Sequence, residues 1–212
     1  MASPRLVEHA SGREASGPLS ERRSKTRRRL LRAAAAVFAA KSVPEATVEE
    51  ILREAGISRR TFYQFFSDKI DLLAAVYASS VNHLHALRIE ATVKPTTGIE
   101  RLLAGFDVYL RFQAEAGPLV RVLASEALRP ESPLGPMRQA LIDRTVELYV
   151  ERFAEVEGRP LDPMLVRALV LMSEATNLHM VTTTPVGERD IEHVRAVVHH
   201  LVRRALEPDG AG

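Results

Sequence analysis

The sequence predicts an all-α protein, in which a small module of three helices is joined by a long helix to a larger helical domain. Apolar residues recur at helical spacing through most of the 212 residues, and no segment alternates like a half-buried strand. Prolines, glycines and capping residues divide the apolar stretches into segments of helical length. These two observations fix the fold class.

The composition limits the functions that the chain can have. It contains no cysteine, which excludes disulfides, a thiolate zinc site and a cysteine nucleophile. Its 29 Lys and Arg nearly balance its 27 Asp and Glu, so the net charge says little about partners. Residues 1–22 lack the apolar stretch of a secretory signal, and no apolar run reaches the length of a membrane span. We expect a cytoplasmic protein without membrane contact, with a disordered tail over 1–22 and a flexible end over 208–212.

The first helix is amphipathic and basic. Leu30, Ala34 and Phe38 lie on one apolar stripe, and the helix should end near Lys41. Its polar side carries a run of basic residues without an acid, which is either a phosphate-binding surface or a solvated helix face: Arg22, Arg23, Lys25, Arg27, Arg28, Arg29 and Arg32. The first three could form a basic arm in a minor groove.

A second, short helix follows between two local signals. Thr47 and Glu50 have the spacing of a capping box, in which each side chain accepts a hydrogen bond from the other's backbone. Gly56 should end the helix, because glycine tolerates a left-handed backbone. This places a short helix between them.

The third helix should run from Arg59 to about Phe66, with Ser58 as its cap. It is too short to be stable alone, so Phe62, Phe65 and Phe66 should anchor it to its neighbours. Two short helices after a longer one are typical of a helix-turn-helix, here over residues 23–67, whose last helix enters a major groove.

The side chains left outside on the third helix suit DNA. Arg59 and Arg60 can pair with guanine edges, Gln64 can pair with adenine, and the Tyr63 hydroxyl can reach a phosphate. Lys69 lies in the first turn of the next helix, where a cation is unfavourable unless an anion such as a phosphate lies nearby. Each of these residues alone could be an ordinary exposed side chain, but together on one face they favour DNA binding.

The larger domain, over residues 68–207, offers weaker signals. Its helices should cover about 67–91, 97–115, 118–129, 136–157, 163–182 and 187–206. Glu126 shares an apolar face, so it pairs with a cationic ligand group, meets a buried arginine or reaches solvent. His83, Tyr109 and Asn177 are further candidate ligand contacts, although such residues are more often explained as core residues or, for the histidine, as a surface or core residue. The histidines lack metal-ligand spacing, so we expect no metal, no cofactor and no catalytic residue.

Residues 30–73 resemble the DNA-binding module of the tetracycline-repressor (TetR) family. The matching segments are Leu30–Ala34, Phe38–Lys41, Thr47–Ile51, Arg53–Ser58, Thr61–Tyr63, Phe66, Lys69 and Leu72–Leu73. The resemblance implies that Thr47, Tyr63 and Lys69 contact backbone phosphates, that Arg59, Arg60 and Thr61 face bases or phosphates, and that Ser58 caps the recognition helix. Arg28 of the basic run joins this set. Ser42 stands where the family usually has glycine, so a positive φ there would strain it.

The resemblance also implies a homodimer, a small-molecule effector and a repressor that leaves an inverted-repeat operator when the effector binds. Two seams could form the dimer, or could pack only within one chain: Met137, Leu141, Thr145, Leu148 and Arg152, with Ile191, Val194, Val198, Leu201 and Val202. An alternative is a DNA-associated scaffolding protein with a protein partner. An enzyme would need a catalytic cluster, and the sequence shows none.

Overall fold

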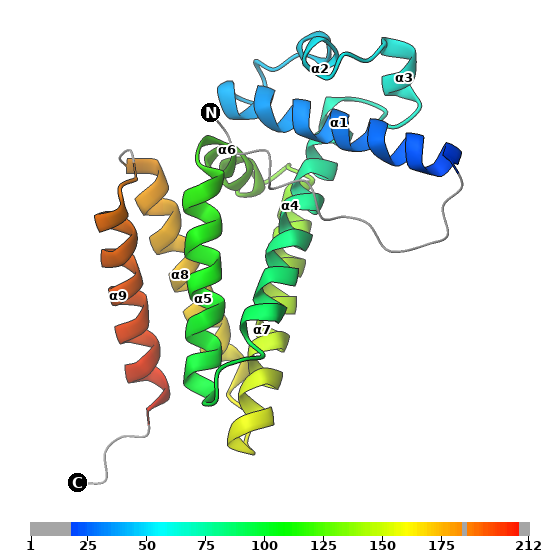
Figure 1. Cartoon of the computed structure of the whole chain (residues 1–212). Helices are drawn as coiled ribbons and strands as arrows, with labels where there is room; N and C mark the ends of the chain where they lie inside the picture. The colour runs from blue at the N-terminus through cyan, green and yellow to red at the C-terminus, as the bar shows by residue number, and fades with distance from the viewer. Residues whose placement is uncertain (1–17, 184–185, 208–212) are drawn as a thin grey trace, which may run out of the picture. The chain divides into compact units, whose positions relative to one another are not determined.

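The computed structural model describes residues 18–183 and 186–207 (Figure 1). Within these ranges it contains α-helices and no strand, which confirms the all-α prediction. None of the described helices combines the length and apolar character that a bilayer crossing requires. The helices are α1 (Pro18–Ala40), α2 (Val48–Ala55), α3 (Arg59–Tyr63), α4 (Lys69–Ala91), α5 (Gly98–Ala116), α6 (Pro118–Ala127), α7 (Leu134–Glu157), α8 (Pro163–Thr183) and α9 (Glu188–Leu206).

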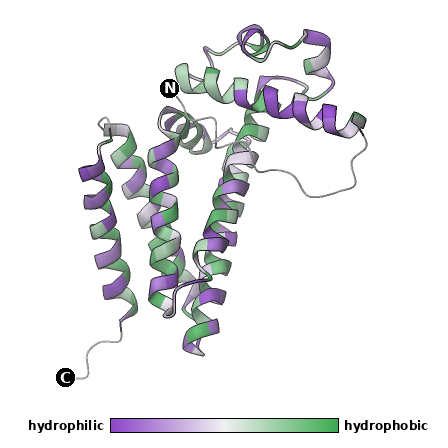
Figure 2. Ribbon diagram, in the orientation of Figure 1, coloured by the Kyte–Doolittle hydropathy of each residue, from purple (hydrophilic) through white to green (hydrophobic). Residues whose placement is uncertain are grey.

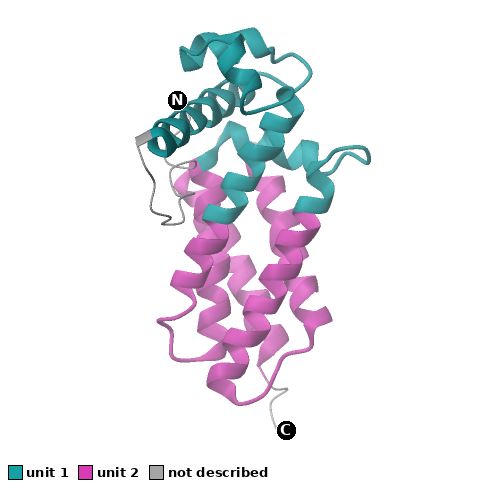
Figure 3. Cartoon of the chain, turned by 90° about the vertical axis from the view of Figure 1, so that its right-hand side faces the viewer, with its two compact units in different colours: residues 1–83, 116–137 teal, residues 84–115, 138–212 magenta. Residues whose placement is uncertain are grey.

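The chain divides into two compact units (Figure 3). Unit 1 comprises residues 1–83 and 116–137, and unit 2 comprises residues 84–115 and 138–212. Helix α4 contributes residues up to His83 to unit 1 and its remainder to unit 2. The functional division into a helix-turn-helix domain over 23–67 and a larger domain over 68–207 stays a prediction.

Two helix ends differ from the sequence prediction. Helix α1 begins at Pro18, so residues 18–22 are helical where a disordered tail was expected, and residues 1–17 lie outside the described part. Proline is favoured in the first turn of a helix, which accounts for the early start. Helix α3 ends at Tyr63, and the Phe65 and Phe66 amides of the turn that follows both donate to the Phe62 carbonyl, at 2.8 and 3.0 Å. A turn therefore replaces the last predicted residues of α3.

The expected strain at Ser42 is absent. Among the described residues only glycines have positive φ. The Ser42 amide instead donates to the Glu45 carboxylate at 3.2 Å, and the Ser42 carbonyl accepts from the Ala46 amide at 3.0 Å. The turn after α1 is thus built by local hydrogen bonds that need no left-handed residue.

Unit 1 is held by the apolar side of α1. Leu30, Ala34 and Phe38 are completely buried, which confirms the predicted stripe, and α1 packs against α2 and α6. Figure 2 shows the other property of this helix: its N-terminal half is hydrophilic and its C-terminal half is mainly hydrophobic. The C-terminal half of α1 therefore packs in unit 1, and the N-terminal half carries the basic residues.

Unit 2 is a bundle whose helices are joined by ion pairs. Arg101 near the start of α5 meets Glu155 near the end of α7 at 2.5 Å, so these two helices are antiparallel. Arg195 of α9 meets Asp107 of α5 at 3.1 Å, and α8 packs against α9. The apolar core includes Tyr149, whose ring centroid lies 5.2 Å from that of Phe106.

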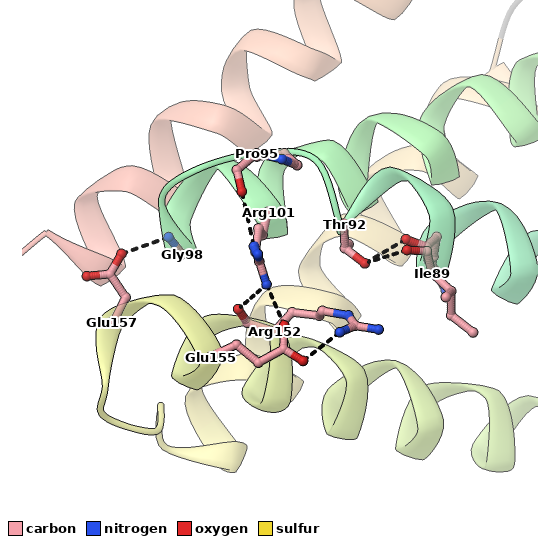
Figure 4. A network of polar contacts seen from close by, with 9 residues as sticks. Ile89, Thr92, Pro95, Gly98, Arg101, Arg152, Glu155 and Glu157 are labelled. Carbon is pink, nitrogen blue, oxygen red and sulfur yellow. Dashed lines mark hydrogen bonds and ion pairs between the residues drawn. The ribbon is translucent and has the colours of Figure 1, made fainter.

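A polar network fixes the α4–α5 connection to the end of α7 (Figure 4). The Gly98 amide donates to the Glu157 carboxylate at 2.7 Å. Arg101 donates from Nε to the Pro95 carbonyl at 3.1 Å and from Nη1 to the Arg152 carbonyl at 3.3 Å. Glu157 of α7 and Arg101 of α5 therefore both hold the α4–α5 connection.

Candidate nucleic-acid interface

The start of α2 is a complete capping box. The Thr47 hydroxyl accepts from the Glu50 amide at 3.3 Å, and the Glu50 carboxylate accepts from the Thr47 amide at 3.1 Å. The Lys41 ammonium group forms an ion pair with Glu50. These contacts, with the Lys41 hydrogen bond as the largest cause and Thr47 next, lower the pKa of Glu50 to about 2. The predicted cap is confirmed, and Thr47 itself is exposed at the helix N-terminus.

The turn between α2 and α3 is held by Arg29, a member of the basic run on α1. Gly56 adopts the predicted left-handed conformation, with φ of 60°. Arg29 donates to the Ala55 carbonyl at 2.7 Å and reaches the Gly56 carbonyl at 3.4 Å. A cation at the carboxyl end of a helix is favourable for the helix dipole. Arg29 therefore acts within the module, where the sequence suggested a phosphate-binding surface.

Helix α3 is capped and anchored as predicted. The Thr61 amide donates to the Ser58 hydroxyl at 3.2 Å. Phe62 is completely buried and Phe66 is 4% exposed. Phe65 is only partly buried and is covered by the Arg23 guanidinium, 5.1 Å from its ring centroid.

The outer face of α3 presents the side chains predicted to read DNA. Arg59, Arg60 and Gln64 are exposed, and 54% of Tyr63 is accessible to solvent. Thr61 is half-buried. Arg59 forms an ion pair with Glu49 of α2, which holds its guanidinium beside the recognition helix. Sequence reasoning missed Glu49, because its partner lies on a different helix.

Lys69 has partners other than the predicted phosphate. Its ammonium group donates to the carbonyls of Val43, Pro44 and Ala46 at 2.8, 3.1 and 2.8 Å. An ammonium group has three N–H donors, so all three are used. The sequence correctly indicated that this cation needs an electronegative partner. Carbonyls of the α1–α2 loop supply it, and Lys69 thereby positions the loop that leads to Thr47.

Some residues of the basic run on α1 pack on phenylalanines of the module, and others are simply exposed. Arg23 stacks on Phe65, and Arg27 lies 5.8 Å from the Phe66 ring centroid. Arg22, Lys25 and Arg28 are exposed on the same helix. The predicted minor-groove arm is thus a helix in its described part, and one of its three residues packs on the recognition module.

The four candidate ligand residues are divided between the two units. His83 and Glu126 belong to unit 1, whereas Tyr109 and Asn177 belong to unit 2. Glu126 meets Arg129 at 3.6 Å, and because Arg129 is exposed, this partner is not the buried arginine that the sequence left open. The Tyr109 hydroxyl accepts from Gln113 at 2.7 Å.

Asn177 is the candidate that keeps an unsatisfied atom. It is 1% exposed and donates to the Ser173 hydroxyl at 3.3 Å, while its Oδ1 has no hydrogen-bond partner. Over residues 18–183 and 186–207 no three His, Asp or Glu side chains gather as metal ligands.

The dimer seams are only partly available. Thr145, Leu148, Val198 and Val202 are buried within their own chain. Leu201 of α9 is 42% exposed, and other apolar side chains on α8 and α9 are also exposed: Met164, Leu171 and Val197. Helices α8 and α9 therefore each carry exposed apolar side chains.

Comparison with known proteins agrees with this geometry. Residues 30–76 match the family of bacterial regulatory proteins described as the tetR family. Over 76 residues, 36% of this chain, the sequence is 43% identical to the uncharacterized HTH-type transcriptional regulator TtgW of Pseudomonas putida. The match spans about half of the length of that relative, 53%.

Solved structures share the fold over most of the chain. A putative TetR-family transcriptional regulator from Mesorhizobium loti superposes with a TM-score of 0.70 at 20% identity, covering 87% of this chain and 96% of that one. The transcriptional regulator FadR from Bacillus subtilis, in complex with stearoyl-CoA, gives a TM-score of 0.68 at 18% identity over 84% and 98% of the two chains. At these identities the likeness concerns the fold.

Proposed function

We propose that this chain, whose residues 30–76 match the tetR family of bacterial regulatory proteins, is a transcriptional regulator that binds operator DNA as a homodimer. The observation that carries the proposal is the outer face of α3. Arg59, Arg60 and Tyr63 are exposed there, while the buried Phe62 and the Ser58 cap hold the short helix in place.

The exposed groups divide into those that position the protein and those that read sequence. Thr47, at the N-terminus of α2, and the Tyr63 hydroxyl are suited to phosphate oxygens. Arg60 and Gln64 are suited to guanine and adenine edges. To contact DNA, Arg59 exchanges its ion pair with Glu49 for a base or a phosphate. Glu49 therefore competes with DNA for Arg59, which disfavours DNA sequences that offer Arg59 a weaker contact. Arg28, exposed on α1, adds a cation toward the backbone.

A dimer follows from the length of DNA that one module can hold. A single short helix contacts only a few base pairs, whereas two modules about 34 Å apart read an inverted repeat in successive major grooves. The exposed apolar side chains of α8 and α9 are the surface that such a dimer would bury: Met164, Leu171, Val197 and Leu201.

We further propose that a small molecule bound in the larger domain releases the operator, so that the protein is a repressor. A neighbour in fold, FadR from Bacillus subtilis, is a regulator seen in complex with stearoyl-CoA. Helix α4 contributes residues to both units, which makes it the connection through which differential binding would act.

Footprinting on the DNA around the gene tests the proposal. We expect protection of an inverted repeat and a loss of affinity of about tenfold or more for Arg60→Ala, because a bidentate contact to guanine is lost. Arg111→Ala, an exposed arginine of α5, is the matched control and should leave the affinity unchanged. Equal affinity of the wild type for specific and random DNA would contradict the proposal.

A further inference from the structure

Arg88 is a buried cation in the part of α4 that belongs to unit 2. It is 3% exposed, and among the described residues it is the only charged side chain that is buried. Its Nη1 donates to the Thr145 hydroxyl of α7 at 2.9 Å, and its guanidinium carbon lies 4.9 Å from the ring centroid of Tyr109 on α5. Its Nε is buried and has no hydrogen-bond partner.

No carboxylate of the described residues forms an ion pair with Arg88. Several acids of unit 2 are paired with other cations: Asp107 with Arg195 and His199, Asp143 with Arg167, and Glu155 with Arg101 and Arg152. Those arginines are more exposed than Arg88, yet each has an acid. Because a buried charge without a counter-ion is strongly unfavourable, the exception calls for an anion that the chain does not itself supply.

The surroundings of Arg88 are electropositive. His85 lies one turn earlier on α4, and burial first, then the charges of Arg144 and Arg88, lower its pKa. The His85 Nδ1 atom is buried without a hydrogen-bond partner. Burial raises the pKa of the Tyr149 hydroxyl, and the neighbouring charge of Arg88 opposes that rise. The unsatisfied His85 Nδ1 and Arg88 Nε atoms therefore lie in a positively charged part of unit 2.

Apolar core side chains of unit 2 adjoin this place through Tyr149, whose hydroxyl feels the charge of Arg88. Tyr149 packs on Phe106, and both belong to the core of unit 2 together with Leu102, Val146 and Val170. An occupant that pairs with the guanidinium would therefore meet apolar side chains beside its charge. The free Nε edge of an arginine can pair with two oxygens of one acidic group.

We propose that the effector is an amphipathic organic acid whose acidic group is bound by Arg88. The proposal rests on the proposed function for the idea that an effector exists. It adds the chemical class of that effector and the residue that recognises it. Binding supplies the missing counter-ion of Arg88, and the apolar body of the acid lies among the core side chains of unit 2.

The test measures binding to the full-length protein without DNA, by titration calorimetry. The probes are saturated fatty acids from octanoate to hexadecanoate, each compared with the alcohol of the same length. We expect at least one acid to bind about tenfold or more tightly than its alcohol, since the alcohol cannot form the charged pair. Arg88→Met should abolish this preference and Arg88→Lys should keep part of it, whereas the exposed Arg111→Met should keep all of it.

Thermal unfolding of the ligand-free variants gives an independent readout. Removing an unpaired buried charge should raise the midpoint of Arg88→Met by a few degrees relative to the wild type. The proposal is overturned if no acid of the series binds, if Arg88→Met keeps the preference, or if its ligand-free midpoint falls. If acids bind as expected but the wild type fails to bind operator, the proposed function fails and this inference stands.

Discussion

Glu50 is a single side chain that couples the stability of the recognition module to acidity. Its pKa is lowered to about 2 by Lys41 and Thr47, below the ordinary value of a glutamate. A carboxyl group whose pKa is lowered by folding adds stability above its unfolded pKa and loses that stability as the pH falls toward the folded pKa.

We therefore expect the wild type to lose stability between about pH 4.5 and pH 2, and Glu50→Gln to show a flatter profile over that window. Acid unfolding followed by circular dichroism measures the difference. Glu54→Gln, at an exposed position of the same helix, is the control and should follow the wild type. Identical profiles for wild type and Glu50→Gln would refute the coupling.

Lys69 and Arg28 distinguish positioning from contact with DNA. Lys69→Met removes three hydrogen bonds to loop carbonyls and should destabilise the protein by about 1–3 kcal/mol, because two of those carbonyls are partly buried. The slope of operator affinity against salt should stay unchanged, since no phosphate contact is lost.

Arg28→Ala should behave in the opposite way. It should leave the unfolding free energy nearly unchanged. The slope of log affinity against log salt concentration should fall by about one, because one phosphate fewer is neutralised and one counterion fewer is released on binding. Fluorescence anisotropy at several salt concentrations, with denaturant unfolding, measures both quantities. A reduced salt slope for Lys69→Met would contradict this expectation and would support the phosphate contact that the family resemblance implies for Lys69.

The site residues that sequence could identify are those whose partners lie within four positions. Thr47 with Glu50 and Ser58 with Thr61 were readable because capping depends on spacing alone. The partners of Lys69 and Arg29 were not readable, since these carbonyls lie 23 to 27 positions away along the chain. Arg88 was missed for the same reason: nothing in its own helix reveals that it lacks an acid.

Gly105 is one of the glycines at which helix α5 comes close to α7. An added Cβ at Gly105 would overlap the Tyr149 hydroxyl and ring. Gly105→Ala gains helix propensity of about 1 kcal/mol but must displace a completely buried tyrosine, so we expect a net loss of about 1–3 kcal/mol of unfolding free energy.

Gly135→Ala in the first turn of α7 is the matched control, since its Cβ would lie 3.7 Å from the nearest atom, an ordinary contact. It should be neutral or slightly stabilising. Denaturant unfolding of both variants decides the matter. A Gly105→Ala variant as stable as the wild type would show that the Tyr149 ring moves at little cost.

The helices themselves were predictable because their boundaries are set by local signals. Pro118, Pro163 and Gly187 lie at or next to the observed helix starts. The two ends that differ are those where other contacts decide. The last turn expected for α3 gives way to a turn in which Phe65 meets Arg23 of α1, and the start of α1 extends beyond the apolar stripe that defined it.

Assembly of the whole protein is expected to depend on the apolar surface of α8 and α9. Leu201→Glu should convert a dimer into monomers, because it places charges in a buried apolar contact. Sedimentation measures the mass, and operator affinity should fall together with it. Leu128→Glu, at a residue 53% exposed on unit 1, is the control and should leave both unchanged. A dimeric Leu201→Glu protein would place the interface elsewhere.

Arg29 and Lys69 hold backbone carbonyls at the two ends of α2, so the whole recognition module is clamped by cations from its flanking helices. A genetic screen for lost repression should therefore recover substitutions at both positions as readily as substitutions on α3. Such mutants would resemble operator-contact mutants in a reporter assay, yet raising protein abundance or lowering temperature should rescue them, because their defect lies in folding of the reader.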